Sequence, residues 1–174
     1  MKPQRRIGAL VLLSLVAGLA ACGGSPEPAS YTDPFAYCAA VGTVDAPGAD
    51  YTGPKVPEVI AQGLQVAMEA PDTPLGIILR GSFWRCVDGQ VYACFVGANL
   101  PCNAKANTDR TPAQEAVAFC LANPDSDFIP AVATGRETVY EWRCRAGTPE
   151  VVRQVNEVDA QGYFSSIWYG ISPE

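Results

Sequence analysis

The sequence predicts an α+β fold in which about three helices pack on a small antiparallel sheet of about five strands, stabilised by disulfide bonds. Three observations support this prediction. The turn pair Asp88-Gly89 separates two runs rich in aromatic and β-branched residues, as in a β-hairpin. Alternation with period two returns after Arg136, as in further strands. Six of the seven cysteines follow Cys22, and an even number favours complete pairing in an oxidising compartment.

Residues 1–21 have the pattern of a secretory signal peptide. Lys2, Arg5 and Arg6 precede an uncharged apolar run that is shorter than the ~20 residues of a membrane-spanning helix. The run ends in Leu19-Ala20-Ala21-Cys22. This motif resembles the lipobox of bacterial lipoproteins, and the resemblance implies that Cys22 carries a covalent lipid and becomes the first residue of the mature chain. The alternative is an ordinary secretory signal in which Cys22 is incidental. No cofactor other than this lipid is expected.

The mature chain is strongly acidic. Without Lys2, Arg5 and Arg6, nine basic and 18 acidic residues remain, a net charge of −9. Such a chain lacks the basic surface that nucleic acids require, so nucleic acid is not expected as a partner. It is also poorly suited to electrostatic binding of anionic lipids. We therefore expect attachment to the membrane through acyl chains on Cys22.

The chain is expected to divide into the signal peptide, a lipidated flexible tether at 22–32 and a single domain at 33–174. Gly23 and Gly24 follow Cys22, with no aspartate beside it. In the Gram-negative lipoproteins that the lipobox resembles, this pattern implies transfer to the outer membrane. We expect an extracytoplasmic location in the cell envelope, at the outer membrane if the cell is Gram-negative.

Two helices are expected at the start of the domain. Asp33 is a suitable N-cap and Gly42 a suitable stop, which predicts a first helix over 34–41. Residues 43–55 are rich in Gly and Pro and are expected to form a loop. A second helix is expected over 57–69, and residues 75–79 are expected to form a short strand. The apolar face of the second helix would consist of Val59, Ile60, Leu64 and Ala67.

The turn at Asp88-Gly89 determines which side chains of the hairpin share a face. A two-residue turn pairs Val87 with Gln90 and Cys86 with Val91. Because side chains alternate along a strand, Cys86 and Cys94 fall on opposite faces and should not bond to each other. One face carries Trp84, Cys86, Val91 and Ala93, and the other carries Phe83, Arg85, Tyr92 and Cys94.

A capping box predicts the third helix, after a polar loop at 97–110. Thr111 would be the N-cap, Pro112 the first helical residue and Gln114 the third. The helix is expected to end near residue 121, with Val117, Cys120 and Leu121 on one face. Residues 123–135 would be loop. Further strands are expected between Arg136 and the turn at 146–149, over 151–158 and over 163–171.

The pattern W-R-C-x-x-G occurs twice, beginning at Trp84 and at Trp142. One interpretation is a binding surface made of two Trp-Arg pairs. The other is a core strand in which Trp and Cys point inward and Arg points outward. Alternation alone favours the core strand. An internal duplication is a further possibility.

Disulfide bonds are expected for all six cysteines of the domain, which are Cys38, Cys86, Cys94, Cys102, Cys120 and Cys144. Six cysteines allow about 15 connectivities. A Cys94–Cys102 bond is expected because Gly97 and Pro101 can turn the short segment between them. Cys86 and Cys144 would then pair with Cys38 and Cys120, in an order that the sequence leaves open.

No catalytic or metal-binding motif stands out. The chain has no histidine and no C-x-x-C, which excludes Ser-His-Asp and Cys-His catalysis and disfavours a thioredoxin-like redox site. The cysteine spacings match no zinc signature. A pair of carboxylates stays possible, with Glu58, Asp88, Glu137 and Glu141 as candidates.

Two functional hypotheses follow. The first is a non-enzymatic lipoprotein that binds an envelope protein or glycan, or supports envelope assembly. The second is a glycan-directed extracytoplasmic hydrolase that uses two carboxylates. The mature chain also resembles uncharacterised secreted bacterial proteins with similar cysteine and W-R-C patterns, a resemblance that implies no function.

The polar loop at 97–110 is the candidate partner-binding surface. It is long for a connection in a compact domain, and such loops are often functional. Its polar side chains offer donors, acceptors and positive charge in an acidic chain. The candidate residues are Asn99, Asn103, Lys105, Asn107 and Arg110.

The lipobox assignment predicts that Cys22→Ser abolishes lipidation and processing of the signal peptide. Serine lacks the thiol to which the lipid is attached. Metabolic labelling with a radioactive fatty acid, together with the gel mobility of the chain, measures both effects. A variant that matures normally and stays acylated in the membrane fraction would show that Cys22 is not the anchor.

Overall fold

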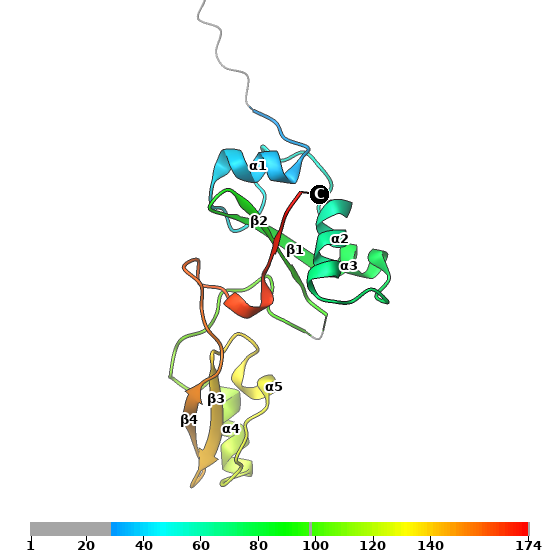
Figure 1. The fold of residues 1–174 in the computed structure, drawn as a ribbon. Coiled ribbons are helices and arrows are strands. Elements are labelled where there is room, and N and C mark those ends of the chain that lie inside the picture. Colours follow the sequence, from blue (N-terminus) through cyan, green and yellow to red (C-terminus); the bar gives the residue numbers. More distant parts are fainter. Residues whose placement is uncertain (1–28, 98, 174) are drawn as a thin grey trace, which may run out of the picture.

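The structure is a computed structural model that describes residues 29–97 and 99–173. The expected signal peptide and Cys22 lie outside the described residues, as does most of the expected tether. Figure 1 shows two lobes joined by two connecting segments. One segment comes before the second lobe in the sequence, and the other comes after it. No helix in 29–97 or 99–173 is long and apolar enough to cross a membrane.

The first lobe packs three helices against a three-stranded antiparallel sheet (Figure 1). The helices are α1 (Pro34–Val41), α2 (Glu58–Ala67) and α3 (Leu75–Gly81), and the sheet has the order β1-β2-β5. The strands are β1 (Ser82–Val87), β2 (Gln90–Phe95) and β5 (Tyr169–Ile171), with the short 3-10 helix η1 (Ser165–Ile167) just before β5.

The second lobe packs α4 (Gln114–Ala122) and α5 (Ala131–Thr134) beside a separate hairpin of β3 (Tyr140–Arg145) and β4 (Thr148–Gln154). The α+β class and its disulfide bonds are therefore confirmed. The described residues contain five strands, as expected, but they form two sheets and are accompanied by five α-helices instead of about three.

Two sheets form because both edges of the β1–β2 hairpin are already occupied. β5 returns from the end of the chain and pairs with β2, with Val91 opposite Ile171. On the other side, Val44 forms an isolated bridge with Cys86 of β1. The β3–β4 hairpin has no free edge to join, and it pairs only within itself.

The predicted β1–β2 hairpin is confirmed in register, turn and faces. Val87 lies opposite Gln90 and Cys86 opposite Val91. Asp88 and Gly89 have φ values of 51° and 79°, which is the left-handed conformation that a type I′ turn requires. The Trp84 face packs into a core with α1 and α2. The Cys94 face packs into a second core.

The first predicted helix is confirmed. The strand predicted at 75–79 and the buried position predicted for Ala67 are wrong. The carboxylate of Asp33 accepts hydrogen bonds from the backbone of Phe35 and Ala36, both at 2.8 Å, so it caps α1 as expected. The expected strand at 75–79 is helical because Pro74 starts α3. A short apolar run can belong to either element. Ala67 is exposed, so it does not belong to the buried face of α2.

Gly63 weakens the helix prediction for α2, but the packing of this helix requires it. A Cβ atom at Gly63 would lie 2.6 Å from a methyl group of Ile171 in β5. Only glycine lets α2 approach this strand so closely.

The capping box at Thr111 does not form. The carboxylate of Asp109 accepts a hydrogen bond from the Thr111 backbone at 2.8 Å, and this turn delays the start of α4 to Gln114. The buried side of α4 is Ala116 and Cys120. Val117 and Leu121, expected on the buried face, are 38% and 73% exposed.

The expected strand over 163–171 is reduced to Tyr169–Ile171. Before it, Phe164, Ile167 and Trp168 are buried at a helix-like spacing through η1. The strand predicted from the alternation of side chains after Tyr163 is therefore wrong before Tyr169. The loop expected at 123–135 also contains a short helix, α5.

Arg85 does not point outward as expected, because it is only 2% exposed. Both faces of the β1–β2 hairpin are covered, which the alternation of side chains does not reveal. Its guanidinium forms an ion pair with Asp159 and lies over the rings of Tyr163 and Trp168, 4.3 Å from each ring centre. Arg143, at the equivalent position of the repeat, is half-buried and bonds to Glu150 at 2.9 Å.

The two W-R-C segments belong to two copies of one structural unit. In each copy a helix is joined by a disulfide to the first strand of a hairpin. The first unit consists of α1, β1 and β2 with the bond Cys38–Cys86. The second unit consists of α4, β3 and β4 with the bond Cys120–Cys144. The predicted Cys94–Cys102 bond is also present, and the open order of the other two bonds is now resolved.

Backbone hydrogen bonds repeat at equivalent positions in the two units. In each, the hairpin donates to residues that lie four, five and six positions after the helix cysteine. In the first unit the bonds are Gly89 N to Gly42 O (2.9 Å), Asp88 N to Thr43 Oγ1 (2.9 Å) and Cys86 N to Val44 O (3.0 Å). In the second unit they are Gly147 N to Pro124 O (2.9 Å), Ala146 N to Asp125 Oδ1 (3.3 Å) and Cys144 N to Ser126 O (2.7 Å).

This correspondence extends the similarity beyond the six-residue motif. Ala36-Tyr37-Cys38 matches Ala118-Phe119-Cys120, and both hairpin turns have two residues with positive φ. The units differ mainly in the chain between helix and hairpin, because α2 and α3 lie in the first unit's longer connection. The domain therefore contains an internal structural repeat.

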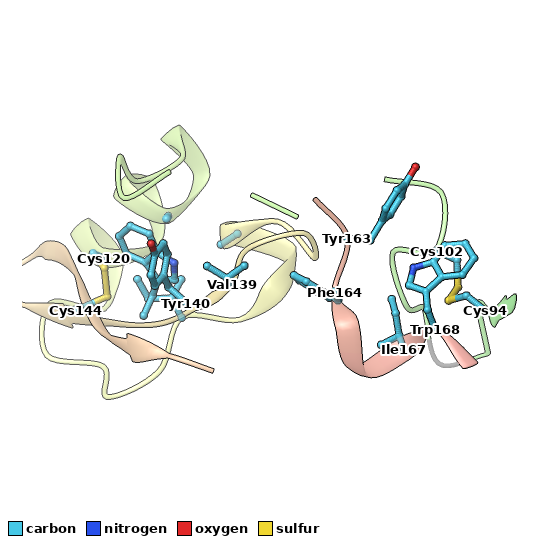
Figure 2. Close-up of a cluster of buried hydrophobic side chains, with 14 residues drawn as sticks. Cys94, Cys102, Cys120, Val139, Tyr140, Cys144, Tyr163, Phe164, Ile167 and Trp168 are labelled. Atoms are coloured by element: carbon cyan, nitrogen blue, oxygen red, sulfur yellow. A yellow bond between two sulfur atoms is a disulfide. The ribbon is translucent and has the colours of Figure 1, made fainter. Parts of the chain in front are cut away.

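A shared core joins the units. The buried cluster that contains Cys120 and Val139 of the second lobe continues to Cys94 and Cys102 of the first. Figure 2 shows Phe164 between these two ends of the cluster, beside Val139 on one side and Ile167 on the other. The segment that leads to β5 thus connects the lobes through buried side chains.

The repeat predicts that each unit depends on its own disulfide. Replacing Cys120 and Cys144 with alanine opens a loop with a sequence separation of 24 residues. The change should lower the free energy of unfolding by about 3 kcal/mol. Hydrogen exchange should show that α4 and β3 lose protection first. The Cys38→Ala, Cys86→Ala variant is the matched control, with first losses in α1 and β1. Equal loss of protection in both units from either variant would contradict the prediction.

Candidate functional site

A cleft of about 520 Å³ beside Trp84 is the largest of five cavities in the described part of the chain. It lies where the start of β1 meets the loop between α1 and α2. We call it the Trp84 cleft. Its lining is mostly apolar and consists of Ala46, Pro47, Gly48, Tyr51, Gly53, Lys55, Val56, Ser82, Phe83 and Trp84.

Aromatic side chains hold the cleft in shape. The rings of Tyr51 and Trp84 meet edge to face with centres 4.9 Å apart, and Tyr37 packs against both. The Trp84 indole donates to the backbone oxygen of Lys55 at 2.7 Å, and the Tyr37 hydroxyl accepts from the Gly48 backbone at 2.8 Å. The loop is therefore fixed to the hairpin, and the cleft is preformed.

The polar groups of the cleft are few. The hydroxyl groups of Ser82 and Tyr51 are buried and have no hydrogen-bond partner within 29–97 and 99–173. Burial, and secondly the charge of Asp33, raise the pKa of Tyr51, so its hydroxyl stays protonated. Lys55 is exposed at the rim, with its ammonium 5.9 Å from the centre of the Phe83 ring. It forms no ion pair with any described residue.

The second unit has a cleft at the equivalent place, with a volume of about 380 Å³. Trp142 and the two residues before it line this cleft, as Trp84 and the two residues before it line the first. Phe128 matches Ala46, because each is eight residues after its helix cysteine. The chemistry differs: Glu141 takes the place of Phe83, and its carboxylate bonds to Arg153 at 2.6 Å.

Comparisons with protein-family models, curated protein sequences and solved structures found no match.

Three of the four candidate carboxylates of the hydrolase hypothesis accept hydrogen bonds from neighbouring side chains. Glu58 accepts a hydrogen bond from Gln62, Asp88 from Thr43, and Glu141 from Arg153. Five cavities in the described part of the chain each contain at most one carboxylate, from Asp109, Glu141 or Asp159. Glu137 lines none of these five.

The cations of the candidate loop at 97–110 stack on tyrosine rings of their own chain. The Lys105 ammonium lies 4.0 Å from the centre of the Tyr163 ring and bonds to Asp45 at 2.6 Å. Burial would lower the pKa of Lys105, but the hydrogen bonds and charges of Asp45 and Tyr163 together outweigh it and the pKa is raised. Arg110 lies over Tyr140, 4.9 Å from the ring centre.

The asparagines of this loop have different environments. Asn99 and Asn103 are exposed, and Asn99 has a positive φ of 69°. The side chain of Asn107 accepts a hydrogen bond from the Asp109 backbone at 2.8 Å, and its backbone forms a bridge with Thr138. The loop is therefore fixed to both lobes, and its role in binding stays a prediction.

Sequence analysis missed the Trp84 cleft. Residues 43–55 were expected to be only a connection, although this loop also is long and carries Tyr51 and Lys55. Residues 43–55 and 97–110 are both long connections, so length alone does not distinguish them. In the described part of the chain, no group of three or more acidic, cysteine or histidine side chains is placed to hold a metal ion.

Proposed function

We propose that the protein is a lipid-anchored binding module of the cell envelope, held extracytoplasmically by Cys22 and at the outer membrane in a Gram-negative cell. The Trp84 cleft is the observation that carries this proposal. A preformed, mostly apolar cavity with a few polar groups is the usual form of a binding site. The tether at 22–32 would let the domain reach partners near the membrane.

The chemistry of the cleft favours a protein partner over a glycan. Sugar rings present many hydroxyl groups, and the cleft offers few side chains to bond them. An apolar side chain of a partner would fill the space between Pro47, Phe83 and Val56. Lys55 would pair with an acidic group next to that side chain, since no described residue neutralises it.

Site-specific cross-linking in the native membrane tests this proposal. A photo-reactive benzoyl-phenylalanine at Ala46, in the lining of the cleft, should form a discrete adduct with one envelope protein. The same group at Ala40, exposed on α1, should form none. Ala46→Trp fills the cleft and should lower the amount of the copurified partner about tenfold, whereas Ala40→Trp should not.

A charge reversal gives an independent control. Lys55→Glu should weaken the adduct, whereas Arg80→Glu changes the net charge equally on α3, away from the cleft, and should have no effect. Equal adducts from positions 46 and 40, or an unchanged adduct in Lys55→Glu, would contradict the proposal. In the same assay, the Lys105→Ala, Arg110→Ala variant reports whether the loop at 97–110 contributes.

A further inference from the structure

A smaller cavity, of about 150 Å³, lies beside Arg85 and shares no lining residue with the Trp84 cleft. It is formed between the β1–β2 hairpin and the C-terminal segment. We call it the Arg85 cavity. It is lined by Arg85, Val87, Tyr92, Asp159, Gln161, Ser165 and Trp168.

Three buried hydrogen-bond donors in this lining have no acceptor. Arg85 donates to Asp159 through Nη2. Its Nε and Nη1 groups have no hydrogen-bond partner among the described residues. The same is true of the Trp168 indole Nε1. Arg85 and Trp168 are 2% and 7% exposed. The aromatic rings over the guanidinium do not satisfy these groups, because its N–H bonds lie in its own plane.

Such an arrangement is costly unless something accepts these hydrogen bonds. A buried donor without an acceptor has lost its hydrogen bonds to water without replacement, and the loss is greater when the group is charged. In native proteins nearly all buried polar groups have a partner. Donors without acceptors that line a common cavity therefore indicate that the cavity receives an acceptor from outside the chain.

The charges around the cavity limit what that acceptor can be. Burial would raise the pKa of Asp159, but hydrogen bonds from Arg85 and from the backbone of Tyr163 and Gln161 outweigh it, and the pKa is lowered. Asp159 is therefore ionised and already balances Arg85. A doubly charged anion such as phosphate would be repelled by this carboxylate. A single carboxylate can accept hydrogen bonds from a guanidinium and adds only one negative charge.

We propose that the Arg85 cavity binds a monovalent carboxylate. One carboxylate oxygen accepts from Nη1 of Arg85, and the indole of Trp168 donates a further hydrogen bond to the carboxylate. Gln161 and Ser165 line the cavity from the C-terminal segment. This site is independent of the Trp84 cleft, since the two cavities share no lining residue.

The three tryptophans give the test an internal control. The indole groups of Trp84 and Trp142 already donate to the Lys55 backbone and to Thr138. Acetate is titrated into the 15N-labelled full chain, and the three indole N–H signals are followed by NMR. The signal that disappears in Trp168→Phe should shift saturably, whereas the other two should not. Inorganic phosphate at the same concentration should cause a much smaller shift.

A charge at the cavity rim tests the site without removing Arg85. Gln161→Glu places a second carboxylate beside the cavity and should weaken acetate binding about tenfold. Gln114→Glu, exposed on α4, adds the same charge elsewhere and should leave binding unchanged. No saturable shift, equal shifts of all three indoles, or equal weakening in both glutamate variants would overturn the proposal.

The source of the carboxylate is distinguished by a second ligand. N-acetyl-alanyl-alanine carries the carboxylate of a peptide C-terminus, and its amide is the matched control. Binding of the acid tenfold tighter than acetate, with no binding of the amide, assigns the site to a peptide terminus. Equal binding of the acid and acetate assigns it to free carboxylates. Binding of the amide as tight as the acid would overturn the requirement for a carboxylate.

Discussion

The buried ion pair between Arg85 and Asp159 is the contact on which the arrangement of the chain depends. Arg85 belongs to the first hairpin, and Asp159 to the segment that returns from the second unit. The same carboxylate accepts from the backbone of Gln161 and Tyr163 at 3.0 and 2.9 Å, which turns the chain toward η1 and β5. Lowering the pH through the depressed pKa of Asp159 would remove this stabilisation, which is fully present above the ordinary pKa of an aspartate.

The internal repeat is consistent with two sheets in place of the single sheet that the sequence predicts. Each unit buries one side of its hairpin against its own helix and secures it with its own disulfide. The first unit has further elements, α2, α3 and the returning β5, and these supply buried side chains to its core. Its cleft is correspondingly larger and more apolar than the equivalent cleft of the second unit. The two units therefore differ at the position where we place binding.

Short-range sequence patterns predicted local features correctly. They did not reveal contacts between segments that are distant in the sequence. Asp88-Gly89 determined the hairpin and its register, and the short Cys94–Cys102 link followed from the turn residues between them. The burial of Arg85 could not be predicted, because it depends on Asp159, which lies 74 positions further along the chain. The Trp84 cleft could not be predicted for the same reason, since the loop between α1 and α2 forms it together with the start of β1, which lies much later in the sequence.

A double-mutant cycle on Arg85 and Asp159 tests the central claim most directly. Urea unfolding is measured for Arg85→Met, Asp159→Asn and the double variant. Asp159→Asn leaves a buried charge unpaired and should cost about 3 kcal/mol or more. The double variant should be more stable than the sum of the single changes implies, with a coupling energy of about 2 kcal/mol. Effects that add within about 0.5 kcal/mol would show that the pair does not hold the C-terminal segment in place.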